Sequence, residues 1–413
     1  MINMKEVPIK ICILSKADSF GGGASKCAED LSVRLNHAGH KVRHYCYWSG
    51  KGFNAIRHPL ITRFYKVIFF FREKFEKKVF GLPELFPFEL PFLLRGGILS
   101  YDIVHFHDIC SAISPLTVYY LATRKPVVWT FHDCSSFTGG CLYPMGCEKY
   151  KTKCIKCEHK QWPIDSPFIK TSLLQKIKKN IFSNTGISLI SPSQWMANMA
   201  YSASALNRIP IVINNGVDTS LYQAINKNIA RKSLSLPENR YVILISAASF
   251  SDERKGFKYA IESIKRIIDL DPYIILMGNV SENLLQTELN GIDNKIFGYQ
   301  SDPNIINQIY ASADVFLFPS LADNQPLSIL ESFASGTPVV AFDVGGIPEM
   351  IDQNSGAVVI QKDVEALSQA LRKFKNKEYS ALASVLVRKL AIERYSMNIF
   401  LDNHINLYRT LMV

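Results

Sequence analysis

Four of the five cysteines in the polar, lysine-rich stretch HDCSSFTGGCLYPMGCEKYKTKCIKC (132–157) are considered together as one group. They are Cys141, Cys147, Cys154 and Cys157. Such a group can bind a metal, form disulfides or supply a reactive thiolate. The Cys-x-x-Cys spacing of the last pair is usual for zinc ligands, whereas the first two are spaced more widely. We expect a structural zinc site, with reduced structural thiols as the main alternative and Cys134 and His159 as spare ligands.

Two cations stand before a glycine in SFSDERKGFKYAI (249–261). Arg254 and Lys255 precede Gly256 and a helical pattern. Cations at this position fit a diphosphate, whose negative charge they can neutralise. The alternative is that they are exposed loop cations without a ligand.

Two carboxylates stand eight positions apart in PSLADNQPLSILESFASGTPVVAFDVGGIPEMI (319–351), at Asp323 and Glu331. The predicted helix that begins between them should turn the amides of Leu327 and Ser328 toward a strand end, which suits an anion. A carboxylate beside an anion is costly unless it accepts hydrogen bonds. Sugar hydroxyls are therefore natural partners for these two groups.

A run of glycines follows the first predicted strand, in ADSFGGGAS (17–25). Gly22 and Gly23 let the backbone approach a ligand at the start of the next helix. The run is not the G-x-G-x-x-G pattern, and the second strand ends at Trp48 rather than at a ribose-binding acidic residue. Both differences argue against a dinucleotide-dependent dehydrogenase.

Buried apolar runs of strand length alternate with helical patterns along the whole chain, which predicts parallel, doubly wound α/β sheets. In the first half the expected strands are 9–15, 41–48, 102–106, 126–131 and 187–191. In the second half they are 241–249, 273–279, 295–299, 314–320, 338–344 and 357–360. The expected helices of the second half are 257–268, 303–313, 326–336 and 364–374.

A chain of 413 residues is too long for one ordinary core. We predict two Rossmann-like domains, residues 1–208 and 209–395, that face a cleft. Ligands of such sheets bind at the carboxyl ends of the strands. Trp129, His105 and His107 are interpreted as structural residues of the first domain.

The net charge of +11 is unevenly distributed, with a balance of +13 in residues 1–206 and −2 in the remainder. The stretch RHPLITRFYKVIFFFREKFEKKV (57–79) reads as a basic amphipathic helix. It either packs on its own domain or lies at an anionic membrane surface. We find no signal-peptide pattern and no apolar run of 18 residues, so we expect a cytoplasmic protein.

Together these motifs resemble the family-four glycosyltransferases, which have the GT-B fold and retain the anomeric configuration. The hallmark is an acidic residue, seven residues, then Glu, followed by a stretch matched here by ASGTPVVA (334–341). Further matching stretches run in the family's order from Gly22 to Ile351: GGAS, DIVHFH, FHD, SPSQW, NNGVD, RKGFKYAIES and ASADVFLFPS. The four-cysteine run resembles a subgroup that builds bacterial exopolysaccharides of colanic-acid, capsule or O-antigen type.

The resemblance implies transfer of a sugar from a nucleotide diphosphate to a hydroxyl of a saccharide acceptor, typically carried on polyprenyl diphosphate. It places the protein at the inner face of the plasma membrane, on an anionic lipid surface. Lys255 with Arg254 would neutralise the leaving group, Glu331 would hold the ribose, and His132 would contact the sugar. The remaining donor contacts would come from Asp323, Asn324, Gln325, the amides of Leu327 and Ser328, and Gly22 and Gly23, which would close over the donor from the other domain.

The sequence departs from the family pattern at two places. The first acidic position is usually Glu and is Asp323 here, and the Arg often found before the Lys is missing, so that Arg254 must substitute. We identify no Asp-x-Asp motif of the metal-using transferases and expect no catalytic metal. The tail 392–413 reads as a helix, and by resemblance its segment 396–413 packs back on the first domain.

Two other functions are considered. Another GT-B enzyme, such as a nucleotide-sugar epimerase or a phosphorylase, would share the fold. A basic, zinc-containing nucleic-acid-binding protein would explain the charge and the cysteines. The cysteine spacing matches no familiar zinc finger and the basic residues are spread through a Rossmann-like domain, so we expect no nucleic-acid partner.

Overall fold

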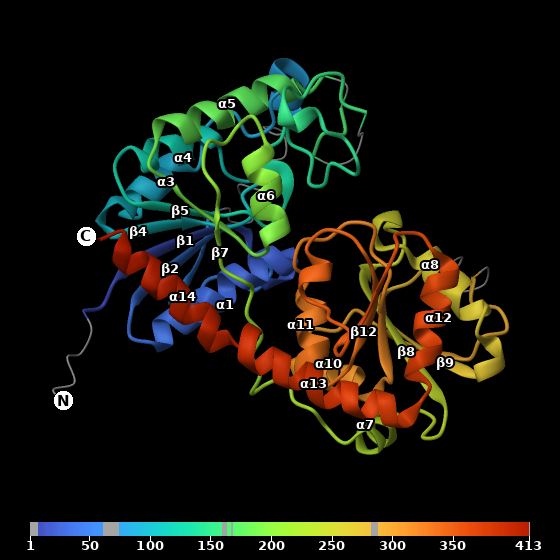
Figure 1. Cartoon of the computed structure of the whole chain (residues 1–413). Coiled ribbons are helices and arrows are strands. Elements are labelled where there is room, and N and C mark those ends of the chain that lie inside the picture. Colours follow the sequence, from blue (N-terminus) through green and yellow to red (C-terminus); the bar gives the residue numbers. More distant parts are fainter. Residues whose placement is uncertain (1–6, 61–73, 159–162, 167, 282–287, 413) are drawn as a thin grey trace. The chain divides into compact units, whose positions relative to one another are not determined.

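The computed structural model of the chain describes residues 7–60, 74–158, 163–166, 168–281 and 288–412. The chain divides into two compact units (Figure 1). Unit 1 consists of residues 1–214 and 401–413, and unit 2 of residues 215–400. The sequence predicted the boundary after residue 208, whereas in the structure a short strand, β7 (Ile211–Val212), still pairs with the sheet of unit 1.

The described part of unit 1 forms a seven-stranded parallel sheet with the order β3-β2-β1-β4-β5-β6-β7. Its other strands are β1 (Lys10–Ala17), β2 (Lys41–Trp48), β3 (Arg57–Pro59), β4 (Ile103–Phe106), β5 (Val127–Thr130) and β6 (Ser188–Ser191). Its helices are α1 (Gly23–His37), α3 (Leu90–Arg95), α4 (Pro115–Ala122), α5 (Thr171–Asn184), α6 (Gln194–Ser202) and most of α14 (Met397–Thr410).

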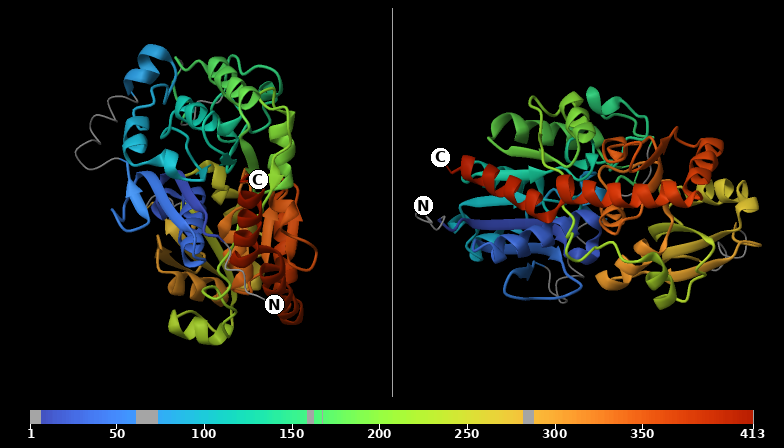
Figure 2. Two further views of the ribbon diagram at one scale, coloured as in Figure 1. Left: turned by 90° about the vertical axis from the view of Figure 1, so that its left-hand side faces the viewer. Right: turned by 60° about the horizontal axis from the view of Figure 1, so that its bottom comes forward.

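Helices cover both faces of this sheet, because successive strand side chains point to opposite sides. Val104 and Phe106 of β4 and Trp129 of β5 belong to one apolar cluster with residues of α4, α5 and α6. The predicted core position of Trp129 is thereby confirmed. Figures 1 and 2 show α1 and the last part of α14 along the other face. That face includes His105, whose ring bonds to Tyr408 of α14.

The described part of unit 2 forms a six-stranded parallel sheet with the order β10-β9-β8-β11-β12-β13. Its strands are β8 (Tyr241–Ser249), β9 (Pro272–Asn279), β10 (Asn294–Gly298), β11 (Val315–Phe318), β12 (Val339–Phe342) and β13 (Gly356–Val359). Its helices are α7 (Lys227–Ser233), α8 (Phe257–Lys265), α10 (Pro303–Ser312), α11 (Leu327–Ala334), α12 (Val364–Phe374) and α13 (Lys377–Tyr395).

Two separate apolar clusters flank the sheet of unit 2, as the near-continuous hydrophobic strands predict. Phe316 and Phe318 pack with α10, α11 and α13, whereas Val315 and Leu317 pack with α8 and α12. Figure 1 shows these two helical layers on either side of the strands. The predicted fold class, two doubly wound parallel α/β domains, is confirmed.

Two sequence predictions need correction. The amphipathic helix predicted over 57–79 does not begin at residue 57, because Arg57–Pro59 pairs with β2 as an edge strand, where a proline is tolerated. Residues 61–73 lie outside the described part, and Glu76–Phe80 forms a short π-helix. The helix predicted over 392–413 is interrupted at Ser396, because the Val217 backbone bonds to Tyr395 and Met397 and replaces part of the helical ladder.

Within the described residues, no helix combines the length and the apolar character needed to cross a membrane.

Two glycines let the loops at the strand ends of unit 2 touch through their backbones. A Cβ added at Gly256 would lie 2.0 Å from the carbonyl oxygen of Pro319, and one added at Gly345 would lie 1.7 Å from that of Asp323. Both glycines have φ in the left-handed region, 68° and 62°. Any larger residue would force these loops apart.

Gly345→Ala should therefore destabilise unit 2 by about 2–4 kcal/mol, because overpacking adds to the left-handed backbone strain. Gly298→Ala is the matched control, since Gly298 has φ of 65° and a Cβ there would meet nothing within 4 Å. Urea unfolding of both variants measures the difference. Equal loss of stability in the two would contradict the close-approach explanation.

Candidate active site

Three loops meet at the carboxyl edge of the sheet in unit 2, because β8, β11 and β12 are neighbours and all run parallel. The loop after β8 carries Arg254 and Lys255 in a short 3-10 helix. The loop after β11 carries Asp323 and leads into α11. The Leu321 N–H donates to the carbonyl of Arg254 at 2.7 Å, which ties the first loop to the second.

Asp323 is the centre of a network of charged and polar groups at this edge. Its Oδ2 accepts hydrogen bonds from Lys255 Nζ at 2.8 Å and from Ser320 Oγ at 2.6 Å. Arg254 Nη1 lies 3.4 Å from the same oxygen and donates to the Ala322 carbonyl at 2.8 Å. The two cations that the sequence assigned to a diphosphate thus converge on the carboxylate that it assigned to the donor sugar.

Burial would raise the pKa of Asp323, but Lys255 and Arg254 outweigh it, and the pKa lies below its ordinary value. The Asp323 and Lys255 side chains are only 13% and 19% exposed, so little solvent screens the pair. Asp323 is therefore ionised at neutral pH and compensates one cation. Arg254 has a second carboxylate partner, Asp252, whose Oδ2 lies 3.1 Å from Nη2.

Helix α11 begins at this edge, and among the described residues no side chain caps its N-terminus, where Pro326 precedes Leu327. The amides of Leu327 and Ser328 are thus the first of the helix and carry its positive dipole end. Glu331 lies about one turn further, and its Oε1 accepts a hydrogen bond from the Tyr222 hydroxyl at 3.2 Å.

Asn324 and Gln325 are both almost fully buried in the loop before α11. Gln325 Oε1 accepts from the backbone N–H of Asn215 at 2.5 Å, and the Gln325 carbonyl accepts from Asn215 Nδ2 at 3.0 Å. The structure thus gives Gln325, which the resemblance assigns to the donor sugar, a second task of bracing the start of unit 2.

Gly22 and Gly23 lie at the carboxyl end of β1 in unit 1, where the chain enters α1. Both are exposed, and Gly22 has φ of 101°, a conformation that glycine adopts without strain. A Cβ on Gly22 would meet nothing within 4 Å. This loop therefore leaves room for a ligand at the carboxyl edge of its own sheet.

His132 follows β5 and is the half-buried end of a chain of histidine rings, in which His105 and His107 are buried. His107 Nδ1 lies 3.0 Å from His132 Nε2, with the two rings stacked. His105 reaches Tyr408 and Thr130 at 2.6 and 2.8 Å through its two ring nitrogens. The neighbouring ring of His107 thus fixes the orientation of His132.

Burial lowers the pKa of His132 to about 3, and His404 lowers it further. Burial also lowers the pKa values of His105 and His107 well below the ordinary value. All three rings are therefore neutral at physiological pH. A neutral His132 can donate or accept a hydrogen bond at a sugar hydroxyl, but it brings no positive charge.

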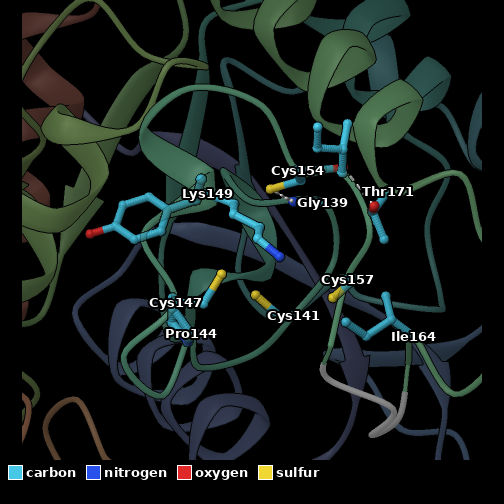
Figure 3. Close-up of a pocket in the computed structure, with 11 residues that line it drawn as sticks. Gly139, Cys141, Pro144, Cys147, Lys149, Cys154, Cys157, Ile164 and Thr171 are labelled. Carbon is cyan, nitrogen blue, oxygen red and sulfur yellow. Dashed lines mark hydrogen bonds between the residues drawn. The ribbon is translucent and has the colours of Figure 1, made fainter.

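One small cavity in unit 1 is lined by Cys141, Cys147, Cys154 and Cys157 (Figure 3). Burial raises the pKa of Cys141 to about 12, and it raises that of Cys154. As free thiols these two groups are poor nucleophiles. Cys134 contacts Met196 and Met199 instead, and His159 lies outside the described residues.

The statement that the chain lacks an Asp-x-Asp motif needs correction, because Asp269 and Asp271 form one. They immediately precede β9, at the amino edge of the sheet. Their carboxylates pair with Arg372 and Arg240 at 2.6 and 2.5 Å. The triplet is thus at the opposite end of the strands from the ligand edge.

The sequence did not identify the partners of the predicted site residues. Three of these partners, Tyr222, Asn215 and Tyr408, stand far along the chain from the residues they contact. The fourth, Ser320, is close to Asp323 but belongs to no pattern that predicts a contact. His107 offered one signal, because the alternation in HFH puts it on the same strand face as His105.

Two family models match the chain: "Glycosyltransferase Family 4" over residues 21–221 and "Glycosyl transferases group 1" over residues 240–376. A colanic acid biosynthesis glycosyl transferase of Escherichia coli, WcaC, described as putative, is 25% identical over 94% of this chain and 97% of its own. A processive diacylglycerol alpha-glucosyltransferase of Acholeplasma laidlawii is 26% identical over 44% of this chain and 54% of its own.

Solved structures share the fold over nearly the whole chain. The Anabaena protein Alr3699/HepE, in complex with UDP and glucose, has a TM-score of 0.68 at 16% identity, covering 98% of this chain and 100% of its own. Sucrose-phosphate synthase from Thermosynechococcus elongatus has a TM-score of 0.71 at 19% identity, covering 97% and 98%. On the two family models and this fold, the chain belongs to the family-four glycosyltransferases with the GT-B fold.

Proposed function

We propose that this chain is a retaining glycosyltransferase of bacterial surface-polysaccharide biosynthesis. It moves a hexose from a nucleotide-diphosphate sugar to a hydroxyl of a saccharide acceptor, which is carried on a lipid diphosphate. The supporting observation is the convergence of Lys255, Arg254 and the N-terminus of α11 on one strand-end site that already holds an anion, the Asp323 carboxylate.

In the proposed reaction, the bond between the anomeric carbon and the diphosphate oxygen breaks. The acceptor oxygen bonds to the same carbon, on the face from which the diphosphate leaves. The acceptor proton ends on the departing phosphate. Lys255 and the amides of α11 stabilise the charge that develops on that phosphate, so that no catalytic metal is needed.

Donor binding changes the partners of Lys255. The Asp323 carboxylate compensates the ammonium group before the donor arrives, at 2.8 Å. A diphosphate offers more negative charge and competes for the same cation. Asp323 can then accept hydrogen bonds from sugar hydroxyls. Because its side chain is short, these hydroxyls would lie close to the loop backbone.

We assign the ribose to Glu331, whose carboxylate already accepts a hydroxyl hydrogen bond from Tyr222. A ribose diol presents the same donor chemistry. UDP is our first candidate for the nucleotide, because a fold relative is described in complex with UDP and UDP-glucose. His132 is proposed to contact the sugar as a neutral ring.

We propose that unit 1 binds an anionic membrane surface from the cytoplasmic side, where a lipid-linked acceptor would be found. Aromatic rings gather on the described residues after position 73, where Phe75, Phe86 and Phe88 are exposed and Phe80 is half-buried. Phe75, Phe80, Phe86 and Phe88 contact one another in sequence, with ring centroids 5.4–5.9 Å apart. Lys74 and Lys78 are exposed beside them. Exposed rings flanked by lysines fit a lipid headgroup layer.

Lys255→Ala should lower kcat by roughly 10²–10³, as for loss of one preorganised electrostatic group. Lys258→Ala, which removes an exposed lysine at the second position of α8, is the control and should keep full activity. Transfer of radiolabelled sugar to acceptor measures both. Turnover unchanged in Lys255→Ala would refute the assignment of the leaving-group site.

Glu331→Ala should abolish the rise in melting temperature that the correct nucleotide sugar produces, because the ribose loses its carboxylate partner. A panel of UDP-, GDP- and ADP-sugars on the wild-type protein first identifies that donor. Tyr222→Phe is the control, since it removes only the resident hydroxyl partner and should leave donor stabilisation in place. If no nucleotide sugar stabilises the wild-type protein, the proposed function is wrong.

Charge reversal at Lys74 and Lys78 should weaken binding to anionic vesicles by more than roughly 30-fold, because loss of each lysine removes about 1 kcal/mol and the new negative charges are repelled. The same reversal at Lys232 and Lys389, two exposed lysines of unit 2, is the control. Sedimentation with vesicles at several salt concentrations measures partitioning. Equal binding to neutral and anionic vesicles would contradict the electrostatic contribution.

A further inference from the structure

One cavity of about 20 Å³ is lined by Cys141, Cys147, Cys154 and Cys157 (Figure 3). All four are partly buried. The remaining lining includes Gly139, Pro144, Ile164 and Thr171. A cavity of this size has room for a single atom or a water molecule. It is too small for an organic ligand.

We propose that this cavity holds one zinc ion, bound by the thiolates of Cys141, Cys147, Cys154 and Cys157. Zinc takes four ligands in a tetrahedron, and soft thiolates favour it over the hard cations that prefer oxygen. The described residues contain no ready-made group of three or more His, Cys, Asp or Glu side chains around a metal position. Binding therefore draws the four sulfurs inward into the small space between them.

The backbone around Cys154 is organised as a zinc-thiolate site requires. The Gly139 N–H donates to the Cys154 sulfur at 3.3 Å, a hydrogen bond that a metal-bound thiolate can also accept. The Cys154 N–H donates to Gln175 Oε1 at 2.8 Å, and the Thr171 hydroxyl donates to the Cys154 carbonyl at 2.7 Å. Helix α5 thus fixes one ligand from outside the loop, as outer partners do at metal sites.

Close packing at Gly139 supports the same conclusion. A Cβ at this position would lie 2.8 Å from the Cys154 Cβ and 2.7 Å from the Thr171 carbonyl oxygen. The glycine therefore lets its amide reach the sulfur. Lys149 lines the same cavity, and its ammonium group, which pairs with Glu158 at 2.7 Å, adds positive charge beside the thiolates.

The metal would order the loop that follows His132. The Cys134 N–H donates to the Leu142 carbonyl at 2.8 Å, and the Thr138 hydroxyl donates to the Cys141 carbonyl at 3.0 Å. The segment holding Cys141 is thus bonded to the turn directly after His132. A zinc ion would brace this turn without a hydrophobic core of its own.

Elemental analysis of the wild-type protein, purified without chelator, should find about one zinc per chain. Stoichiometric modification of its thiols should release that zinc to a metallochromic dye. Replacing zinc with Co²⁺ should give the absorption bands of tetrahedral thiolate coordination. These readouts use the intact protein and need no variant to fold.

Cys154→Ser with Cys157→Ser should reduce bound zinc to less than about a tenth. Cys27→Ser with Cys46→Ser is the control, because both residues are buried elsewhere in unit 1, and it should keep the metal. Protein with no metal and four reactive thiols would overturn the proposal, as would protein in which these cysteines form two disulfides. Donor binding in unit 2 is measured separately, so failure here leaves the proposed function intact.

Discussion

The candidate site depends on loop backbones that touch at the carboxyl edge of the sheet in unit 2. Gly256 lies against the Pro319 carbonyl and Gly345 against that of Asp323, at distances that exclude any Cβ. The parallel order of β8, β11 and β12 brings these loops to one edge, and the two glycines let them close on each other. The position of every charged group there follows from this contact.

Such packing explains why a buried carboxylate is tolerated beside the proposed phosphate site. Asp323 loses solvent, a cost that Lys255, Arg254 and Ser320 offset by charge and hydrogen bonding. The arrangement also keeps Lys255, whose side chain is only 19% exposed, from being an uncompensated cation at the carboxyl edge of the sheet. Without a ligand, the charged groups of these loops pair with one another. When an anion binds, the cations can exchange the Asp323 carboxylate for it.

The sequence predicted the α/β class, the strands of unit 2 to within a few residues, and the loops that carry the charged residues. Those predictions rest on local patterns of apolar runs and glycines. It did not predict α7, because the composition of that segment is polar and shows no apolar periodicity. It also did not predict the partners of Glu331 and His132, because long-range packing decides them. Edge strand β3 was missed because three residues with a proline carry no periodic signal.

Helix α14 makes unit 1 discontinuous in the chain. Tyr408 is fully buried and bonds to His105 of β4, beside the ring chain that ends at His132. During synthesis, unit 1 emerges first, yet the part of its sheet face that α14 covers stays open until all of unit 2 has been made. Unit 1 can therefore complete its packing only after unit 2 has been translated, although its strands are made first.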